Sequence, residues 1–123
     1  IIYILESLLK KLKKIFIQSN TKISEALKNI NVNEIKFVMV VDAHQKLLGT
    51  VTDGDIRRAV LKNIDLNSPV SLIMNSNAIT ANVSMPREKL INFMKNKSIQ
   101  QLPLLDDKKC VVDLLTFQDL ISP

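Results

Sequence analysis

Apolar residues recur along this chain at helical spacing in some stretches and in short continuous runs in others. The first fourteen residues follow the helical pattern, with an apolar face opposite a lysine-rich face. The apolar face consists of Ile1, Ile4, Leu5, Leu8, Leu9 and Leu12. We expect this leader helix, residues 1–14, to pack on the protein or on a partner. The alternative is that it lies on an anionic membrane surface.

After the leader, the pattern predicts the order strand, helix, strand, strand, helix. The expected elements are a strand at 15–17, a helix capped by Thr21, a strand at 37–41, a hairpin strand at 47–51 and a helix that begins near Asp53. Residues 37–41 are an uninterrupted apolar run, so we expect both faces of that strand to be covered.

The same order of elements is expected in the second half of the chain. A polar linker at 63–69 and a short helical turn through Met74 precede it. The expected elements are a strand at 79–81, a helix capped by Ser84 with Pro86 in its first turn, hairpin strands at 102–105 and 110–115, and a helix at 117–121.

Residues 40–56 and 104–120 align without a gap, so that Thr52 corresponds to Thr116 and Asp55 to Asp119, at an offset of 64 (116 − 52 and 119 − 55). A repeat of this length is a complete supersecondary unit. A unit of about 50 residues buries too little surface to be stable alone. We therefore predict an α/β (α+β) fold of two β-α-β-β-α repeats, residues 15–68 with the linker and residues 69–123, packed sheet against sheet around a pseudo-twofold axis.

The composition suits a soluble, cytoplasmic globular module that belongs to a longer chain. Of 123 residues, 46% are apolar and 24% are charged. No apolar run approaches the roughly 20 residues that span a bilayer, residues 1–5 lack the features of a secretory signal, and the chain begins at Ile1 rather than Met. The net charge is +5, but the five aromatic residues do not accompany a basic stripe, which disfavours nucleic-acid binding.

Several kinds of chemistry are disfavoured by residue counts. Cys110 is the only cysteine and His44 the only histidine. An intrachain disulfide is therefore excluded, and a zinc site or a Cys-His nucleophile has no clustered partners. The only glycines are Gly49 and Gly54, too few for a P-loop or a dinucleotide fingerprint. We expect no catalytic residues in this chain and no requirement for a cofactor.

The repeat resembles a tandem pair of cystathionine-β-synthase-type (CBS) domains over residues 15–121. The resemblance rests on the order of elements, on the repeat and on the small-apolar-Thr-x-x-Asp ending of each hairpin. Residues 49–55 match well, whereas Asp113 replaces the usual glycine in the second unit, so we expect that hairpin to twist differently.

One stretch narrows the resemblance further. Leu48–Ala59 is similar to the CBS pair fused ahead of bacterial sugar-phosphate nucleotidyltransferases, and a related string occurs in arabinose-5-phosphate isomerases. Residues 66–70 favour the nucleotidyltransferase.

The resemblance implies that each Thr-x-x-Asp pair binds an adenosine-type nucleotide, with AMP, ADP, ATP and S-adenosylmethionine as possible ligands. The aspartate would accept hydrogen bonds from the ribose hydroxyls, because a carboxylate is an acceptor suited to a diol. The threonine hydroxyl would reach a phosphate oxygen near a helix N-terminus. Thr52 and Asp55 would form one site between the sheets, and Thr116 and Asp119 the other.

Two arginines distinguish the implied sites. Arg57 and Arg58 are the expected phosphate partners, because guanidinium groups match phosphate oxygens. The second unit has Ile121 and Ser122 at the corresponding positions, so we do not expect the two sites to be equivalent.

The residues alone also allow simpler interpretations. Thr-x-x-Asp at the start of a helix is a capping-box variant, in which both side chains satisfy free backbone N–H groups. Residues 53–55 (Asp-Gly-Asp) could suggest a divalent metal, but no further carboxylate follows nearby in sequence, so we disfavour a metal site.

We therefore expect a regulatory CBS module that controls an attached or associated catalytic domain, the resemblance favouring a nucleotidyltransferase. The alternatives are a ligand-free dimerisation scaffold or the CBS pair of an arabinose-5-phosphate isomerase. Apolar groups in 56–61 and 117–121 exceed what one small core needs, so we predict a homodimer. We expect no nucleic-acid or membrane partner.

Overall fold

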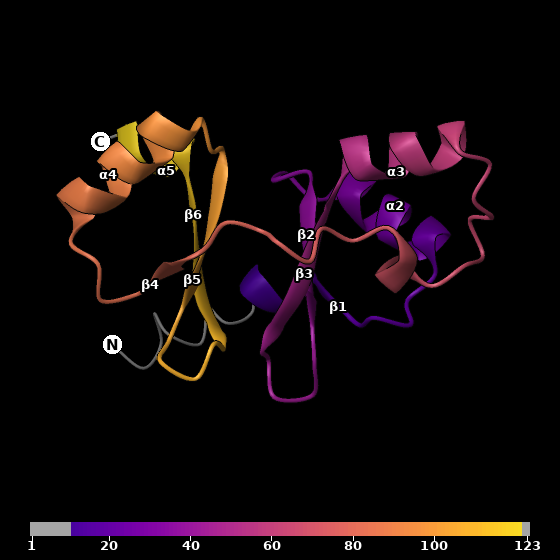
Figure 1. Ribbon diagram of the computed structural model, residues 1–123, viewed down its shortest axis with the longest axis horizontal. Coiled ribbons are helices and arrows are strands. Elements are labelled where there is room, and N and C mark those ends of the chain that lie inside the picture. The colour runs from indigo at the N-terminus through magenta and orange to yellow at the C-terminus, as the bar shows by residue number, and fades with distance from the viewer. Residues whose placement is uncertain (1–10, 122–123) are drawn as a thin grey trace. The chain divides into compact units, whose positions relative to one another are not determined.

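The computed structural model describes the backbone of residues 11–121 and the side chains of residues 11–119. The chain divides into two compact units, one ending at Ala78 and the other beginning at Ile79 (Figure 1). Most of the predicted leader helix lies outside the described residues. Of its last part, residues 11–13 are helical and Leu12 is buried.

The first unit is a three-stranded sheet with two helices on one face (Figure 1). Its elements are β1 (Phe16–Ile17), α2 (Ile23–Val32), β2 (Phe37–Val41), β3 (Leu47–Thr52) and α3 (Asp53–Leu61). The strand order is β1-β2-β3, with β1 parallel and β3 antiparallel to β2. All five residues of β2 are buried, which confirms the prediction from the uninterrupted apolar run.

The core of the first unit is completed by a segment that follows α3 in sequence. Buried residues of α2, β2, β3 and α3 pack together with Val70, which begins the short 3₁₀-helix η1 (Val70–Leu72). The backbone N–H of Val70 donates to the carbonyl of Thr21 at 2.7 Å. The compact unit thus extends to residue 78. The boundary that we predict between residues 68 and 69 instead separates the two sequence repeats.

The second unit repeats this arrangement. Its elements are β4 (Ala81–Asn82), α4 (Arg87–Lys97), β5 (Gln101–Leu105), β6 (Val111–Thr116) and α5 (Phe117–Ile121). The strand order is β4-β5-β6, again with one parallel and one antiparallel pair. Leu104 pairs with Asp113 as Val40 pairs with Gly49, and Ala81, Leu90, Met94, Leu102 and Leu104 form the core. The mixed α/β fold and the repeat are therefore confirmed.

The helix caps predicted at Thr21, before α2, and at Ser84, before α4, are wrong. The residue before α2 is Lys22 and makes no side-chain cap, because the Thr21 hydroxyl accepts the backbone N–H of Gln18 at 3.1 Å. The Ser84 hydroxyl donates to Asn82 Oδ1 at 2.7 Å instead.

Helix α4 begins only at Arg87, because Pro86 is extended and disfavours a helical residue before it. The strand predicted at 79–81 is observed as β4, which starts at Ala81, where pairing with β5 begins.

Candidate functional site

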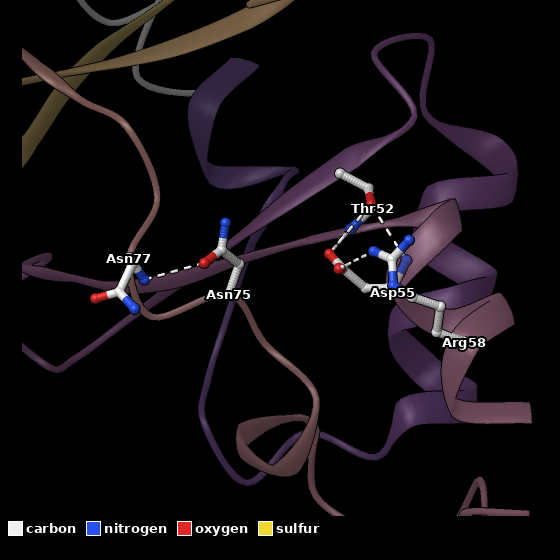
Figure 2. Close-up of polar contacts among 5 residues, drawn as sticks. All are labelled: Thr52, Asp55, Arg58, Asn75 and Asn77. Carbon is white, nitrogen blue, oxygen red and sulfur yellow. Dashed lines mark hydrogen bonds and ion pairs between the residues drawn. The ribbon is translucent and has the colours of Figure 1, made fainter. Parts of the chain in front are cut away.

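The Thr-x-x-Asp sequence of the first unit lies where β3 ends and α3 begins. Thr52 is extended and its hydroxyl accepts the backbone N–H of Asp55 at 3.3 Å. In return, the backbone N–H of Thr52 donates to Asp55 Oδ2 at 2.9 Å (Figure 2). This reciprocal pair is a capping box, so the capping interpretation of these two residues is confirmed.

The two predicted phosphate-binding arginines are held by two different aspartates. Arg58 Nη2 lies 2.6 Å from Asp55 Oδ1, and the Asp55 side chain is only 15% exposed (Figure 2). Arg57 Nη2 lies 2.5 Å from Asp53 Oδ2, and both of these side chains are mostly exposed. Neither ion pair was predicted from the sequence, although the i,i+3 and i,i+4 spacings of opposite charge in a helix indicate both.

Gly54 leaves room for the Arg58 guanidinium. A Cβ atom at position 54 would lie 3.3 Å from Arg58 Nη1 and 3.7 Å from the Thr52 hydroxyl oxygen. The guanidinium is thus folded back over the first turn of α3, beside the Asp55 carboxylate.

A second segment runs beside β3 close to this site. Thr50 and Asn75 exchange two backbone hydrogen bonds, of 2.8 and 3.1 Å. Gly49 permits this approach, because a Cβ atom there would lie 3.0 Å from the Asn75 carbonyl oxygen and 2.9 Å from Met74 Cγ. Asn75 Oδ1 in turn accepts the backbone N–H of Asn77 at 3.0 Å (Figure 2).

The second unit reproduces the cap without the arginines. The Thr116 hydroxyl accepts the backbone N–H of Asp119 at 3.1 Å, and the Thr116 N–H donates to Asp119 Oδ2 at 3.3 Å. Asp113, at the position equivalent to Gly49, accepts the backbone N–H of Leu114 at 2.7 Å. In the first unit the corresponding N–H, of Thr50, donates to the Asn75 carbonyl instead.

The described residues contain neither a cluster of metal-ligating side chains nor a membrane-spanning helix. Within residues 11–121, no three side chains of His, Cys, Asp or Glu gather as a metal site requires. A helix suited to crossing a membrane is not found among the described residues.

Comparison with known families gives the same assignment to both halves of the chain. The sequence profile of the CBS domain matches residues 9–62 and again residues 70–122. The chain belongs to the CBS domain family. The tandem CBS pair expected from the Thr-x-x-Asp repeat is therefore confirmed.

Two larger enzymes are similar to this chain over part of their length. The chain is 33% identical over 102 residues to the L-aspartate semialdehyde sulfurtransferase of Methanocaldococcus jannaschii. It is 30% identical over 107 residues to the inosine-5′-monophosphate dehydrogenase of Aquifex aeolicus. These matches cover 83% and 86% of this chain but only 19% and 21% of the two enzymes. The chain thus spans about a fifth of the length of these two relatives.

Solved CBS structures have the same fold. A CBS domain pair crystallised with 5′-methylthioadenosine and S-adenosyl-L-methionine is 33% identical, with a TM-score of 0.73 over 86% of this chain and 83% of that one. A CBS domain protein from Pyrobaculum aerophilum, complexed with AMP, has a TM-score of 0.76 over 89% of this chain and 84% of that one. The second is 22% identical and shows the fold alone.

Proposed function

We propose that this CBS pair is a regulatory module that binds an adenosine-type ligand beside Thr52 and Asp55. The observation that carries the proposal is the Asp55 carboxylate, which is largely buried in the first turn of α3 and has two arginines within one turn of the same helix. The solved CBS pair that is 33% identical holds two adenosine derivatives, which supports the ligand class.

The geometry allows a division of roles within the ligand. The carboxylate of Asp55 accepts hydrogen bonds from the ribose hydroxyls. The arginines lie on the first two turns of α3, where a phosphate is also favoured by the free N–H groups and the dipole of a helix N-terminus. In the second unit Asp119 takes the ribose role and Thr116 the phosphate role, without cations at the positions that match Arg57 and Arg58.

Calorimetric titration with AMP, ADP, ATP, S-adenosylmethionine and 5′-methylthioadenosine tests this proposal. The wild-type protein should bind at least one of these ligands. Asp55→Ala should weaken binding by roughly 1.5–3 kcal/mol, the scale of hydrogen bonds to a charged group. Asp119→Ala is the matched control and should matter less for phosphorylated ligands. Absence of both heat and thermal shift at millimolar ligand would contradict the proposal.

We further infer that the module regulates a larger enzyme, because the chain covers only a fifth of each of the two enzymes named above. The similarity of Leu48–Ala59 to the pairs of sugar-phosphate nucleotidyltransferases remains the basis for naming that enzyme. The relatives named above catalyse other reactions, so the assignment needs its own assay. Formation of a nucleotide sugar by the full-length protein, with and without AMP, would provide it.

A dimerisation role is the second candidate, and exposed apolar residues on α3 favour it. Val60 is 52% exposed and Leu61 is 76% exposed. We infer that this face contacts a second copy of the chain. In sedimentation experiments, Leu61→Asp should shift a dimer towards monomer. Leu72→Asp, at an exposed position of η1, is the control and should not. A wild-type monomer at high micromolar concentration would contradict this inference.

A further inference from the structure

The Asp55 carboxylate already accepts three hydrogen bonds. Oδ2 accepts the backbone N–H of Thr52 at 2.9 Å and the Thr52 hydroxyl at 3.1 Å. Oδ1 accepts Arg58 Nη2 at 2.6 Å. A carboxylate offers about four acceptor positions, so roughly one remains open.

A ribose diol cannot bind to this arrangement without displacing a donor. Its two hydroxyl groups need two acceptor positions on the carboxylate, and only one is open. The Thr52 N–H is fixed by the backbone at the end of β3. The donors that can leave are therefore the Thr52 hydroxyl and the Arg58 guanidinium.

Arg58 is the easier of the two to displace. Its side chain is 63% exposed, and solvent weakens ion pairs of that exposure. The Thr52 hydroxyl, in contrast, also accepts the backbone N–H of Asp55, so its position is held from both sides. A ribose that binds Asp55 therefore competes mainly with Arg58.

We propose that Arg58 is a competing occupant of the ribose position, and that this competition makes the first unit selective for phosphorylated ribonucleosides over uncharged ones. A ligand that displaces Arg58 leaves a guanidinium without its carboxylate partner. A phosphate on the same ligand supplies a new partner, whereas adenosine does not. The proposal rests on the nucleotide site proposed above and defines the ligand class that this site selects.

Two internal comparisons support this role for Arg58. Arg57 is paired with Asp53 rather than with Asp55, so it does not occupy the ribose position. In the second unit Ser122 takes the place of Arg58, so no cation at that position competes for Asp119. Selectivity for phosphate by displacement should therefore be a property of the first unit alone.

The test uses nuclear magnetic resonance titration of the whole chain with adenosine and with AMP. The backbone amide of Gly54 is the reporter, because Gly54 lies between Thr52 and Asp55 and the chain has only one other glycine. Shifts of this amide report on the first unit even if the second unit also binds ligand. The variants are Arg58→Met, which keeps an aliphatic chain without donors, and Arg57→Met as the matched control.

The proposal predicts opposite changes for the two ligands. Arg58→Met should bind adenosine about two- to fivefold more tightly, because a competing surface ion pair is removed. It should bind AMP about tenfold more weakly, because a charged phosphate contact is lost. Arg57→Met removes the cation that pairs with Asp53, so it should not tighten adenosine binding, even if it weakens AMP binding. Arg58→Ala repeats the measurement with a shorter side chain, in case methionine itself blocks the ligand.

The outcomes separate this proposal from the nucleotide site on which it depends. If wild type binds AMP but both Arg58 variants bind adenosine no more tightly than wild type, Arg58 does not compete and the proposal is overturned. If only the Arg58 variants bind adenosine, the competition is supported. If neither ligand shifts Gly54 in any variant, the nucleotide site and the competition are both excluded.

Discussion

The two units share a backbone plan and a helix cap but differ in the side chains around the cap. The pairing of β2 with β3 and that of β5 with β6 have the same register, and Thr52–Asp55 and Thr116–Asp119 make the same reciprocal bonds. Where the first unit has Gly49, Gly54 and Arg58, the second has Asp113, Gln118 and Ser122. The comparison teaches that the repeated Thr-x-x-Asp residues cap a helix in both units, whereas the residues that differ change what surrounds each cap.

Exchanging the residues at the equivalent positions 49 and 113, glycine in the first unit and aspartate in the second, should have the largest effect on stability. Gly49→Asp introduces a Cβ atom 3.0 Å from the Asn75 carbonyl oxygen and buries a carboxylate beside Met74. We expect a loss of about 3 kcal/mol in the free energy of unfolding, measured with urea. The reverse exchange, Asp113→Gly, removes only the bond to the Leu114 N–H and should cost about 1 kcal/mol. Equal losses would contradict the proposed difference between the hairpins.

The two cap threonines offer a smaller and more direct comparison. Thr52→Ala should cost about 1–2 kcal/mol and Thr116→Ala about 0.5–1 kcal/mol in the free energy of unfolding, since a lost cap typically costs about 1 kcal/mol. The first value is larger because the Thr52 hydroxyl also donates to Asp55, and α3 is longer than α5. Denaturation curves of the two variants measure the difference. A larger loss for Thr116→Ala would contradict the expectation that the Thr52 cap contributes more to stability.

Gly54→Ala should stabilise the first unit by about 0.5 kcal/mol, because alanine favours a helix over glycine. The new Cβ atom meets only the flexible end of Arg58 at 3.3 Å, which can move. Thermal unfolding measures the gain, and the same substitution in an Arg58→Met background is the control. A gain that appears only in that background would show that the Arg58 guanidinium resists displacement.

The smallest expected effect is the contribution of Asp42, in the turn between β2 and β3, to stability at low pH. The backbone N–H of Lys46, followed by that of His44, donates to Asp42 and lowers its pKa below the ordinary value of 3.8. Because the pKa is lower in the folded state, the stabilisation is present above about pH 4 and is lost as pH falls through the folded-state pKa. Asp42→Asn should therefore flatten the decline of melting temperature between about pH 5 and 2. An unchanged decline would contradict this role.

Asp106→Asn is the matched variant for this experiment. Asp106 accepts the backbone N–H groups of Lys108 and Cys110 in the equivalent turn, at 2.9 and 3.0 Å. Thermal unfolding of the two variants at neutral pH compares what these hydrogen bonds contribute to stability in the two turns.

The sequence predicted those features that depend on residues close together in the chain. The apolar run of β2 predicted a buried strand, the start of α3 was placed correctly at Asp53, and the 64-residue offset predicted that Thr52 and Thr116 end equivalent strands. The caps at Thr21 and Ser84 failed because each hydroxyl had a competing local partner. Composition gave no signal for choosing between those partners.

The sequence by itself determined the family, the repeated unit and the two Thr-x-x-Asp positions that begin equivalent helices, because patterning and a long in-register repeat do not depend on distant contacts. Only the tertiary structure decided that Val70 completes the first core, that the backbone of Asn75 packs against Gly49, and that Arg58 forms an ion pair with Asp55. The physical reason is that each of these depends on which groups meet in space. A flexible guanidinium can bind a carboxylate, a phosphate or water, and its surroundings choose among them.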